Sequence, residues 1–344
     1  MQESLVGFAI LLVLILLRLP IAFAMGLVGT VGFAYLVNWN AALAMISSVT
    51  YETGLAYDLS VVPLFILMGN FVTRAGLSDE LYMAANAFLG HRKGGLAMAT
   101  VVACGGFSAV CGSSLATAAT MAKVSMPSMR KYGYSDSLAA GSIAAGGTLG
   151  ILIPPSVILV LYGIMTEQDI GQLFMAGILP GMLGILFYLG AVRATIWLNP
   201  KSGPPGERLP WNERFRALRG VWGVMLLFIL VMGGIYGGIF TPTEAAGIGA
   251  SGAFLFALAR RKLTWPVLFD VLLQSVRSTA MIFSVLIGAL IFSNFINYAD
   301  LPTILTEWVA NSGLQPIGVM LLIMAVYLVL GCILESLSMI LLTV

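Results

Sequence analysis

Two short stretches of the chain set hydroxyl-bearing and backbone-bending residues inside otherwise apolar sequence. Residues 111–117 read Cys-Gly-Ser-Ser-Leu-Ala-Thr, and residues 145–156 include Gly-Gly-Thr followed by Pro-Pro. Non-helical backbone at membrane depth is tolerated only where protein buries it or where it lines a watery cavity. The pair therefore predicts carbonyl and hydroxyl oxygens gathered around an ion, as in the broken helices of secondary transporters.

The ion expected here is a hard cation, because hard cations prefer oxygen ligands and a neutral cage of oxygens can still release them. Glycine allows backbone conformations closed to other residues, and proline lacks the N–H that would pair with a carbonyl one turn back. The residues expected to form this first cation site are Gly112, Ser113, Ser114, Thr117, Gly147, Thr148 and Pro154. The competing interpretation is that these small residues only permit close packing of helices.

A helix N-terminus exposed by one of the breaks is a place where an anion could bind, because the partial positive charge there favours anions. The side chains considered as substrate ligands are Ser108, Ser156 and Arg277. For Arg277 the alternative is a cation that snorkels to the membrane interface. Elsewhere, Glu244 follows a Thr-Pro turn, which is typical of a helix cap.

The composition places these elements in a membrane. Of 344 residues, 59% are hydrophobic and 9% are charged, and the mean hydropathy is +0.99. Soluble domains carry about 25% charged residues, so the chain is predicted to be an all-α polytopic membrane protein. A net charge of +2 gives no reason to expect nucleic acid as a partner. The three cysteines and the single histidine show no metal-binding spacing, so no cofactor and no metal besides the cation of the predicted oxygen cage are expected.

Apolar runs and the polar residues between them predict where the helices lie. Membrane spans are expected near residues 4–17, 20–37, 60–74, 137–165, 173–196, 221–239, 243–259, 279–297 and 316–344. The Pro-Pro stretch interrupts the span at 137–165, which is therefore predicted to be a broken helix. Residues 95–126 are rich in small side chains and predict a re-entrant hairpin with its tip at 112–114. Residues 38–58 and 260–278 are expected to be arms along the membrane surface.

Charge and weak internal similarity divide the chain into two repeats of opposite orientation. The long polar loop at residues 199–220 is rich in basic residues, which predicts that it lies in the cytoplasm. Cys111 matches Cys332, and Gly69 and Pro20 match Gly288 and Pro242 at similar offsets. The turns of matching helix pairs are expected on opposite sides of the membrane. These features predict an inverted repeat. Its first copy is expected at 1–198, a cytoplasmic linker at 199–220, and an incomplete second copy at 221–344.

Several segments resemble the large membrane subunit of tripartite ATP-independent periplasmic (TRAP) transporters. They lie at residues 62–70, 90–97, 111–118, 127–134, 147–156, 173–181 and 238–246. The resemblance implies a sodium-coupled, elevator-type permease that crosses the bacterial inner membrane many times. It also implies a small membrane subunit as partner, lipid around the chain, and a periplasmic binding protein that delivers a carboxylate, usually an organic acid.

The same resemblance suggests a second ion site near the end of the chain. Residues 331–335 resemble the start of a second hairpin tip, where the family commonly has aspartate at the position of Glu335. An ionisable group inside the membrane is a functional candidate by default. Glu335 and Ser336 are therefore the candidates for this second site.

Other functions agree less well with the sequence. A sodium-coupled carboxylate carrier that needs no binding protein would share the broken-hairpin architecture, whereas a channel would need a continuous polar lining. An intramembrane enzyme would need a nucleophile beside a base, yet His91 lies in a loop with Arg92 and Lys93. No catalytic residues are expected, and no phosphate-binding loop that would couple the chain directly to ATP is present. The sequence leaves the identity of the organic acid open.

Overall fold

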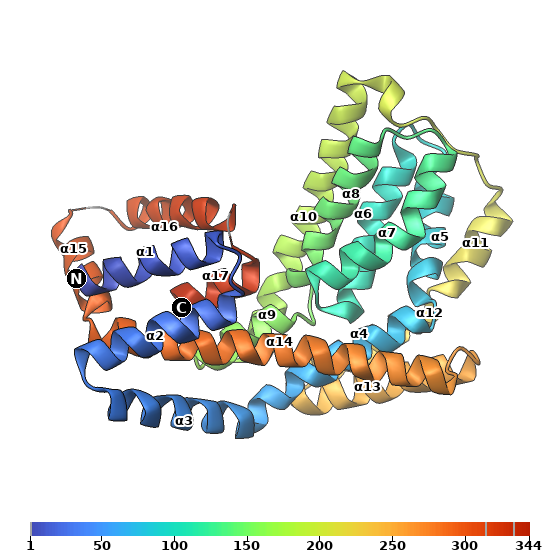
Figure 1. The fold of residues 1–344 in the computed structure, drawn as a ribbon. Helices are drawn as coiled ribbons and strands as arrows, with labels where there is room; N and C mark the ends of the chain where they lie inside the picture. The colour runs from blue at the N-terminus through green and yellow to red at the C-terminus, as the bar shows by residue number, and fades with distance from the viewer. Residues whose placement is uncertain (1, 314, 333) are drawn as a thin grey trace. The chain divides into compact units, whose positions relative to one another are not determined.

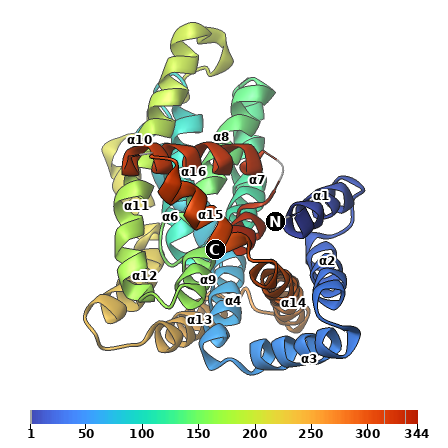
Figure 2. The ribbon, with the colours of Figure 1, turned by 90° about the vertical axis from the view of Figure 1, so that its left-hand side faces the viewer.

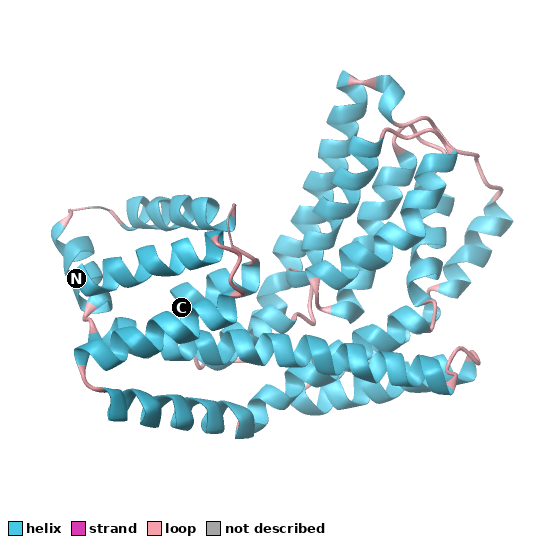
Figure 3. Cartoon of the chain, viewed as in Figure 1, coloured by secondary structure: helices cyan, strands magenta, loops and turns pink. Residues whose placement is uncertain are grey.

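The protein is helical throughout the part of the chain that its structure describes. The structure is a computed structural model, and it describes residues 2–313, 315–332 and 334–344. Every regular element in these ranges is a helix (Figure 3). The prediction of an all-α fold is confirmed.

Helices of membrane-spanning length are present in the described residues. Two helices, α10 (Ile170–Leu198) and α14 (Trp265–Tyr298), are long and apolar enough to cross a membrane alone. Two bent pairs of helices also pass this test if each pair is counted as one span. One pair is α3 with residues 57–74, and the other is α11 with α12, which are bent by 44° relative to each other. The apolar helices α1, α2, α6 and α16 are shorter than this. The helices therefore have the apolar and bent character of a polytopic membrane protein.

The contacts divide the chain into two compact units, Met1–Tyr57 with Ser278–Val344, and Asp58–Arg277. The first unit holds α1 (Gln2–Leu16), α2 (Ile21–Leu36), α3 (Trp39–Leu55), the last part of α14, α15 (Leu301–Asn311), α16 (Pro316–Gly331) and α17 (Ser336–Thr343). Its first three helices pack in chain order, each against the next (Figure 2). Glycine lets two of its helices touch, because a Cβ atom on Gly29 of α2 would lie 2.7 Å from the Cα atom of Phe292 in α14.

The second unit contains both stretches that the sequence singles out. Its elements are α4 (Val61–Arg74), α5 (Leu77–Leu89), α6 (Gly95–Cys111), α7 (Ser114–Lys131), α8 (Asp136–Thr148), η2 (Leu149–Ile151), α9 (Val157–Met165), α10, η3 (Pro200–Ser202), α11 (Trp211–Gly220), α12 (Trp222–Tyr236), α13 (Pro242–Ala259) and the start of α14; η1 (Tyr57–Ser60) precedes α4. Helix α6 is buried over most of its length, with α5, α7 and α8 packed against it (Figure 1). The core of this unit is therefore built around the first arm of the predicted hairpin.

The predicted helices agree with the structure at the turn of the hairpin and at the broken helix. Elsewhere they differ: α5 and α15 were not predicted, and three predicted segments take another form. The linker 199–220 contains a helix, α11, which begins directly after Pro210. The expected arm at 260–278 is not a separate element, because α14 runs unbroken from Trp265; its polar residues lower the hydropathy without breaking the helix. The stretch 316–344 forms two helices, α16 and α17, and Ile333 between them lies outside the described residues. The predicted repeat boundaries stay a prediction.

The expected role of Glu244 as a helix cap is confirmed. Thr241 is the N-cap of α13, and its hydroxyl accepts from the Glu244 N–H at 3.3 Å. The Glu244 carboxylate in turn accepts from the Thr241 N–H at 2.8 Å. Glu244 thus completes a capping box that satisfies two N–H groups at the start of the helix.

Candidate cation site

The hairpin tip is a tight turn that only glycine fits. Helix α6 ends at Cys111 and α7 begins at Ser114. Between them Gly112 has a φ of 65°, in the left-handed region that favours glycine. A Cβ atom on Gly112 would also lie 2.8 Å from the Pro155 carbonyl oxygen. The turn therefore lies where the tip was predicted, although α7 runs to Lys131, beyond the predicted end of the hairpin at 126. That the hairpin is re-entrant stays a prediction.

The second stretch is a break between two helices. Helix α8 ends at Thr148, the single turn η2 follows, and regular helix resumes with α9. The peptide bond between Pro154 and Pro155 is cis. The break packs closely on α10, because a Cβ atom on Gly177 would lie 2.7 Å from the Leu152 carbonyl oxygen. The prediction of a broken helix is confirmed.

The hairpin tip and the helix break touch through their backbones. The Val157 N–H, at the start of α9, donates to the Gly112 carbonyl at 3.3 Å. A Cβ atom on Gly150 would lie 2.6 Å from the Ser113 carbonyl oxygen, and Gly147 likewise leaves no room for a side chain against α7. Gly147 and Gly150 of the helix break therefore leave the space that the hairpin tip occupies.

Three serines that were predicted to be ligands use their hydroxyls in hydrogen bonds to nearby backbone groups. The fully buried Ser108 hydroxyl donates to the Cys104 carbonyl at 2.6 Å. The Ser156 hydroxyl, also fully buried, donates to the Ile151 carbonyl at 2.8 Å and caps α9. Ser113 caps α7 by accepting from the N–H three residues on, at 3.4 Å. Ser108 and Ser156 therefore offer no free hydroxyl proton to a substrate, whereas Ser113 uses only an acceptor site of its hydroxyl.

Thr148 lies apart from the tip that it was expected to join. Its hydroxyl donates to the Ala145 carbonyl at 2.7 Å and pairs with the Tyr188 hydroxyl of α10 at 2.8 Å. Successive residues of a helix point about 100° apart, so when Gly147 faces the tip its neighbour faces elsewhere. The structure thus brings Gly147 and Gly150 to the tip, and leaves the Thr148 side chain with α10.

Unpaired oxygens remain where the tip meets the break. Thr117 is fully buried, and its hydroxyl oxygen has no partner in hydrogen-bond geometry. The Cys111 thiol lies within reach as a weak, polarisable donor. Among the described residues, nothing donates to the Pro155 carbonyl, which faces Gly112, and the half-buried Ser114 hydroxyl makes no hydrogen bond. A buried polar atom without a partner costs about 1–3 kcal/mol, so such atoms call for a ligand or another explanation.

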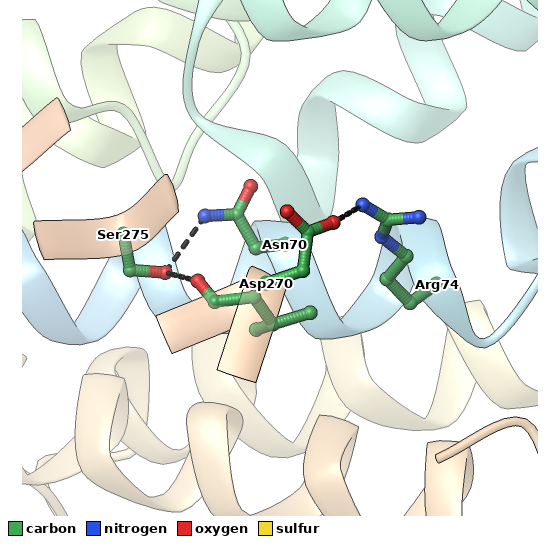
Figure 4. A network of polar contacts seen from close by, with 5 residues as sticks. Asn70, Arg74, Asp270 and Ser275 are labelled. Atoms are coloured by element: carbon green, nitrogen blue, oxygen red, sulfur yellow. Dashed lines mark hydrogen bonds and ion pairs between the residues drawn. The ribbon is translucent and has the colours of Figure 1, made fainter. Parts of the chain in front are cut away.

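The sequence analysis missed a polar bridge beside the tip. A Cβ atom on Gly69 of α4 would lie 3.1 Å from the Cys111 carbonyl oxygen, so α4 passes directly against the end of α6. On the next residue, the Asn70 amide donates to the Ser275 hydroxyl at 2.7 Å, and Ser275 donates to the Val271 carbonyl at 2.8 Å (Figure 4). An asparagine in the apolar run 61–72 was the available signal, because buried amides need partners.

The same bridge carries an ion pair one turn further along α4. Arg74 contacts Asp270 of α14 (Figure 4), and both side chains are partly exposed. Arg277, the predicted substrate ligand on α14, is exposed and pairs with no acidic group among the described residues. Asp270 therefore has a neutralising partner in Arg74, whereas the positive charge of Arg277 has no acidic partner among the described residues.

The candidate second site lies in the first unit. Helix α16 ends at Gly331 and α17 begins at Ser336, as a second hairpin tip would require. Glu335 precedes α17, is exposed, and does not cap the helix with its side chain. Glu335 and Ser336 stay a prediction as ion ligands.

Comparison with known proteins decides the family. The family model for the tripartite ATP-independent periplasmic transporter, DctM component, matches residues 8–344. The chain belongs to this family. It is 37% identical over 293 residues to the C4-dicarboxylate TRAP transporter large permease protein DctM of Pseudomonas aeruginosa, covering 85% of this chain and 68% of that one.

Two further TRAP permeases match this chain over a similar share of their length. The DctM protein of Rhodobacter capsulatus is 35% identical, covering 91% of this chain and 74% of its own. The sialic acid TRAP transporter large permease protein SiaM of Vibrio cholerae is 32% identical, covering 84% and 67%. The resemblance found in the sequence is therefore confirmed, and this chain is a membrane permease of the TRAP family.

Proposed function

We propose that this chain is the large permease subunit of a sodium-coupled TRAP transporter that imports an organic acid across the bacterial inner membrane. A periplasmic binding protein delivers the acid, and a small membrane subunit completes the assembly. The observation that supports sodium coupling is the junction of the hairpin tip and the helix break, where buried oxygens stand without partners.

The ligands of the sodium ion follow from these unpaired oxygens. The Thr117 and Ser114 hydroxyls and the Pro155 carbonyl supply neutral oxygens, the donor type that a reversible alkali-cation site uses. Gly112 and Gly150 shape the backbone around them. Ser113 and Gly147 contribute through their backbones, and Pro154 through the shape of the break.

The substrate class follows from the relatives. Proteins named as permeases for C4-dicarboxylates and for sialic acid match most of this chain. Their named substrates carry carboxylates, so we propose a carboxylate cargo. Helix N-termini at the tip and at α9 supply partial positive charge to meet an anion.

Uptake by the reconstituted assembly tests the whole proposal. Proteoliposomes holding this chain and the small subunit are given a radiolabelled four-carbon dicarboxylate, with and without the binding protein, in sodium or potassium gradients. We expect uptake only with both sodium and the binding protein. Uptake in potassium would exclude sodium coupling, and uptake without the binding protein would favour an autonomous carboxylate carrier.

A pair of threonine variants tests the ion site itself. Thr117→Val removes the unpaired hydroxyl with little change of shape, and we expect the sodium concentration for half-maximal uptake to rise about tenfold, or roughly 1.4 kcal/mol. Thr100→Val is the matched control, because that buried hydroxyl of α6 is already bonded to the Leu96 carbonyl at 2.9 Å. The control should lose stability and keep its sodium dependence. Unchanged sodium activation in Thr117→Val would reject the assignment.

A further inference from the structure

A basic cavity opens at the C-terminal end of α10. Its volume is about 700 Å³. The residues that line it are Arg92, Lys93, Arg193, Ala194, Ile196, Trp197 and Pro200. Three of these side chains are cations and none is acidic, so the cavity has a strongly positive lining.

The three cations are not neutralised within the protein. The ion pairs of the described residues are Arg74–Asp270, Arg130–Asp136 and Arg260–Glu80, and none of them involves the cavity. The pKa of the neighbouring His91 lies below its ordinary value, first because its ring is partly buried and then because Arg214, Arg208 and Arg92 are positively charged. The cavity therefore lies in an unbalanced positive field.

The backbone around the cavity is held in place by close contacts. The Gly94 N–H donates to the Gly203 carbonyl at 2.9 Å, which ties the 91–94 loop to the segment after η3. A Cβ atom on Gly94 would lie 2.7 Å from Cγ1 of Ile196 in α10, and its φ of 73° suits glycine. The loop that carries Arg92 and Lys93 is thus fixed against the helix that carries Arg193.

One face of α10, the helix that leads to the cavity, points away from the rest of its unit. The apolar window of α10 is only 11% buried. Its exposed apolar residues Met175, Leu179, Met182 and Leu186 follow helical spacing, and the same face continues to Arg193 and Trp197. Trp197 is 81% exposed, and tryptophan is enriched where a membrane meets water. An apolar stripe that ends in a tryptophan and three cations matches the profile of a phospholipid from its chains to its headgroup.

We propose that this cavity binds the headgroup phosphate of an anionic phospholipid, whose acyl chains lie along the exposed stripe of α10. Basic pockets on the cytoplasmic side of membrane proteins are suited to such headgroups. Arginine contributes bidentate geometry to the phosphate, and lysine contributes a point charge. The net negative charge of the lipid distinguishes it from zwitterionic lipids that carry the same phosphate.

Native mass spectrometry of the purified protein in detergent tests this binding. The protein is titrated with phosphatidylglycerol or with phosphatidylcholine of the same chains. We expect adducts with phosphatidylglycerol at concentrations about tenfold lower than with phosphatidylcholine. The variant Arg92→Gln/Lys93→Gln/Arg193→Gln should lose that preference. Equal binding of the two lipids, or an unchanged preference in the variant, would overturn the proposal.

A matched control separates the cavity from net charge. Lys131→Gln/Arg216→Gln/Lys262→Gln removes the same charge from exposed positions that do not line the cavity. This variant should keep the preference for phosphatidylglycerol, and an equal loss would show that overall charge rather than the cavity is responsible. Far-ultraviolet circular dichroism of each variant establishes that it is folded.

Two more measurements distinguish a lipid from other occupants. Inorganic phosphate at millimolar concentration should not displace phosphatidylglycerol, because it lacks the chains that the stripe would hold. Displacement would show that the cavity is a phosphate site. Loss of the lipid adduct when the small membrane subunit binds would show that a protein covers the cavity, and would also overturn the proposal.

Discussion

Gly150 and Ser113 lie so close that no side chain can stand between them. A Cβ atom on Gly150 would be 2.6 Å from the Ser113 carbonyl oxygen and 2.9 Å from the Ser114 N–H nitrogen. These atoms are backbone, so they cannot move aside as the end of a flexible side chain would. The contact joins the helix break to the hairpin tip, and it sets the width of the junction where the cation site is proposed.

Replacing Gly150 with alanine is expected to separate these two elements. The added Cβ atom forces a backbone shift, for which overpacking of this kind costs about 1–3 kcal/mol. If sodium binds at the proposed site, it stabilises the folded protein by a free energy that rises with the logarithm of its affinity, so a distorted site should show less protection by sodium. Thermal unfolding of the purified Gly150→Ala protein, with sodium or with potassium chloride, measures both effects.

The control for this substitution lies on the preceding helix. Gly141 of α8 has open space around the position of a Cβ atom. Gly141→Ala should leave the protection by sodium intact and stabilise α8 slightly, because alanine favours helix. Equal loss of sodium protection in the two variants would contradict the close approach described for Gly150.

A second prediction concerns packing in the first unit. Gly29→Ala would place a Cβ atom 2.7 Å from the backbone of Phe292, so we expect a loss of about 1–3 kcal/mol of stability. Gly26→Ala, on the same helix, would meet the Cα atom of Gly288 at an ordinary 4.0 Å and should be tolerated. Guanidinium or thermal unfolding in detergent compares the two. If Gly26→Ala proves the more harmful variant, the crossing of α2 and α14 is not as described.

A third prediction concerns an ion pair that joins α5 to the end of α13. Arg260 donates to the two carboxylate oxygens of Glu80 at 2.8 and 2.9 Å, and both side chains are about three-quarters buried. A double-mutant cycle with Glu80→Gln and Arg260→Gln should give a coupling of about 1–2 kcal/mol, because bidentate pairs away from water are stronger than exposed ones.

The exposed pair Arg130–Asp136 is the reference for that cycle. Its atoms lie 3.3 Å apart and both side chains are mostly exposed, so its coupling should be below about 0.5 kcal/mol. Added salt should weaken the exposed pair more than the partly buried one. Similar couplings for the two pairs would count against the geometry of Arg260 and Glu80.

The sequence predicted those helices whose ends carry strong local signals. The turn at Gly112 and the break before α9 follow from glycine and proline chemistry, which acts within a few residues. The prediction failed where polar residues lie within a helix. Asp270 and Arg277 lower the hydropathy of α14, yet neither breaks a helix, and their neighbours favour helix.

The candidate site was predicted in its location and only partly in its side chains. Glycine and proline placed the two breaks, but the direction of each hydroxyl depends on helix phase and on partners distant in sequence. Thr148 meets Tyr188, forty positions away, and its orientation could not be read from the local motif. The role of Asn70 could not be predicted for the same reason, because its partner Ser275 is 205 positions away.

The length of α14 restricts how the chain lies in a bilayer. At 1.5 Å per residue its 34 residues extend for roughly 50 Å, well beyond the hydrocarbon thickness of about 30 Å. If the apolar residues 279–298 fill that thickness, the preceding turns overhang it by roughly 20 Å. Asp270 then reaches headgroup or water, where a charged residue is inexpensive, and Arg74 accompanies it there. The ion pair thus keeps the charged end of α4 beside the charged turns at the start of α14.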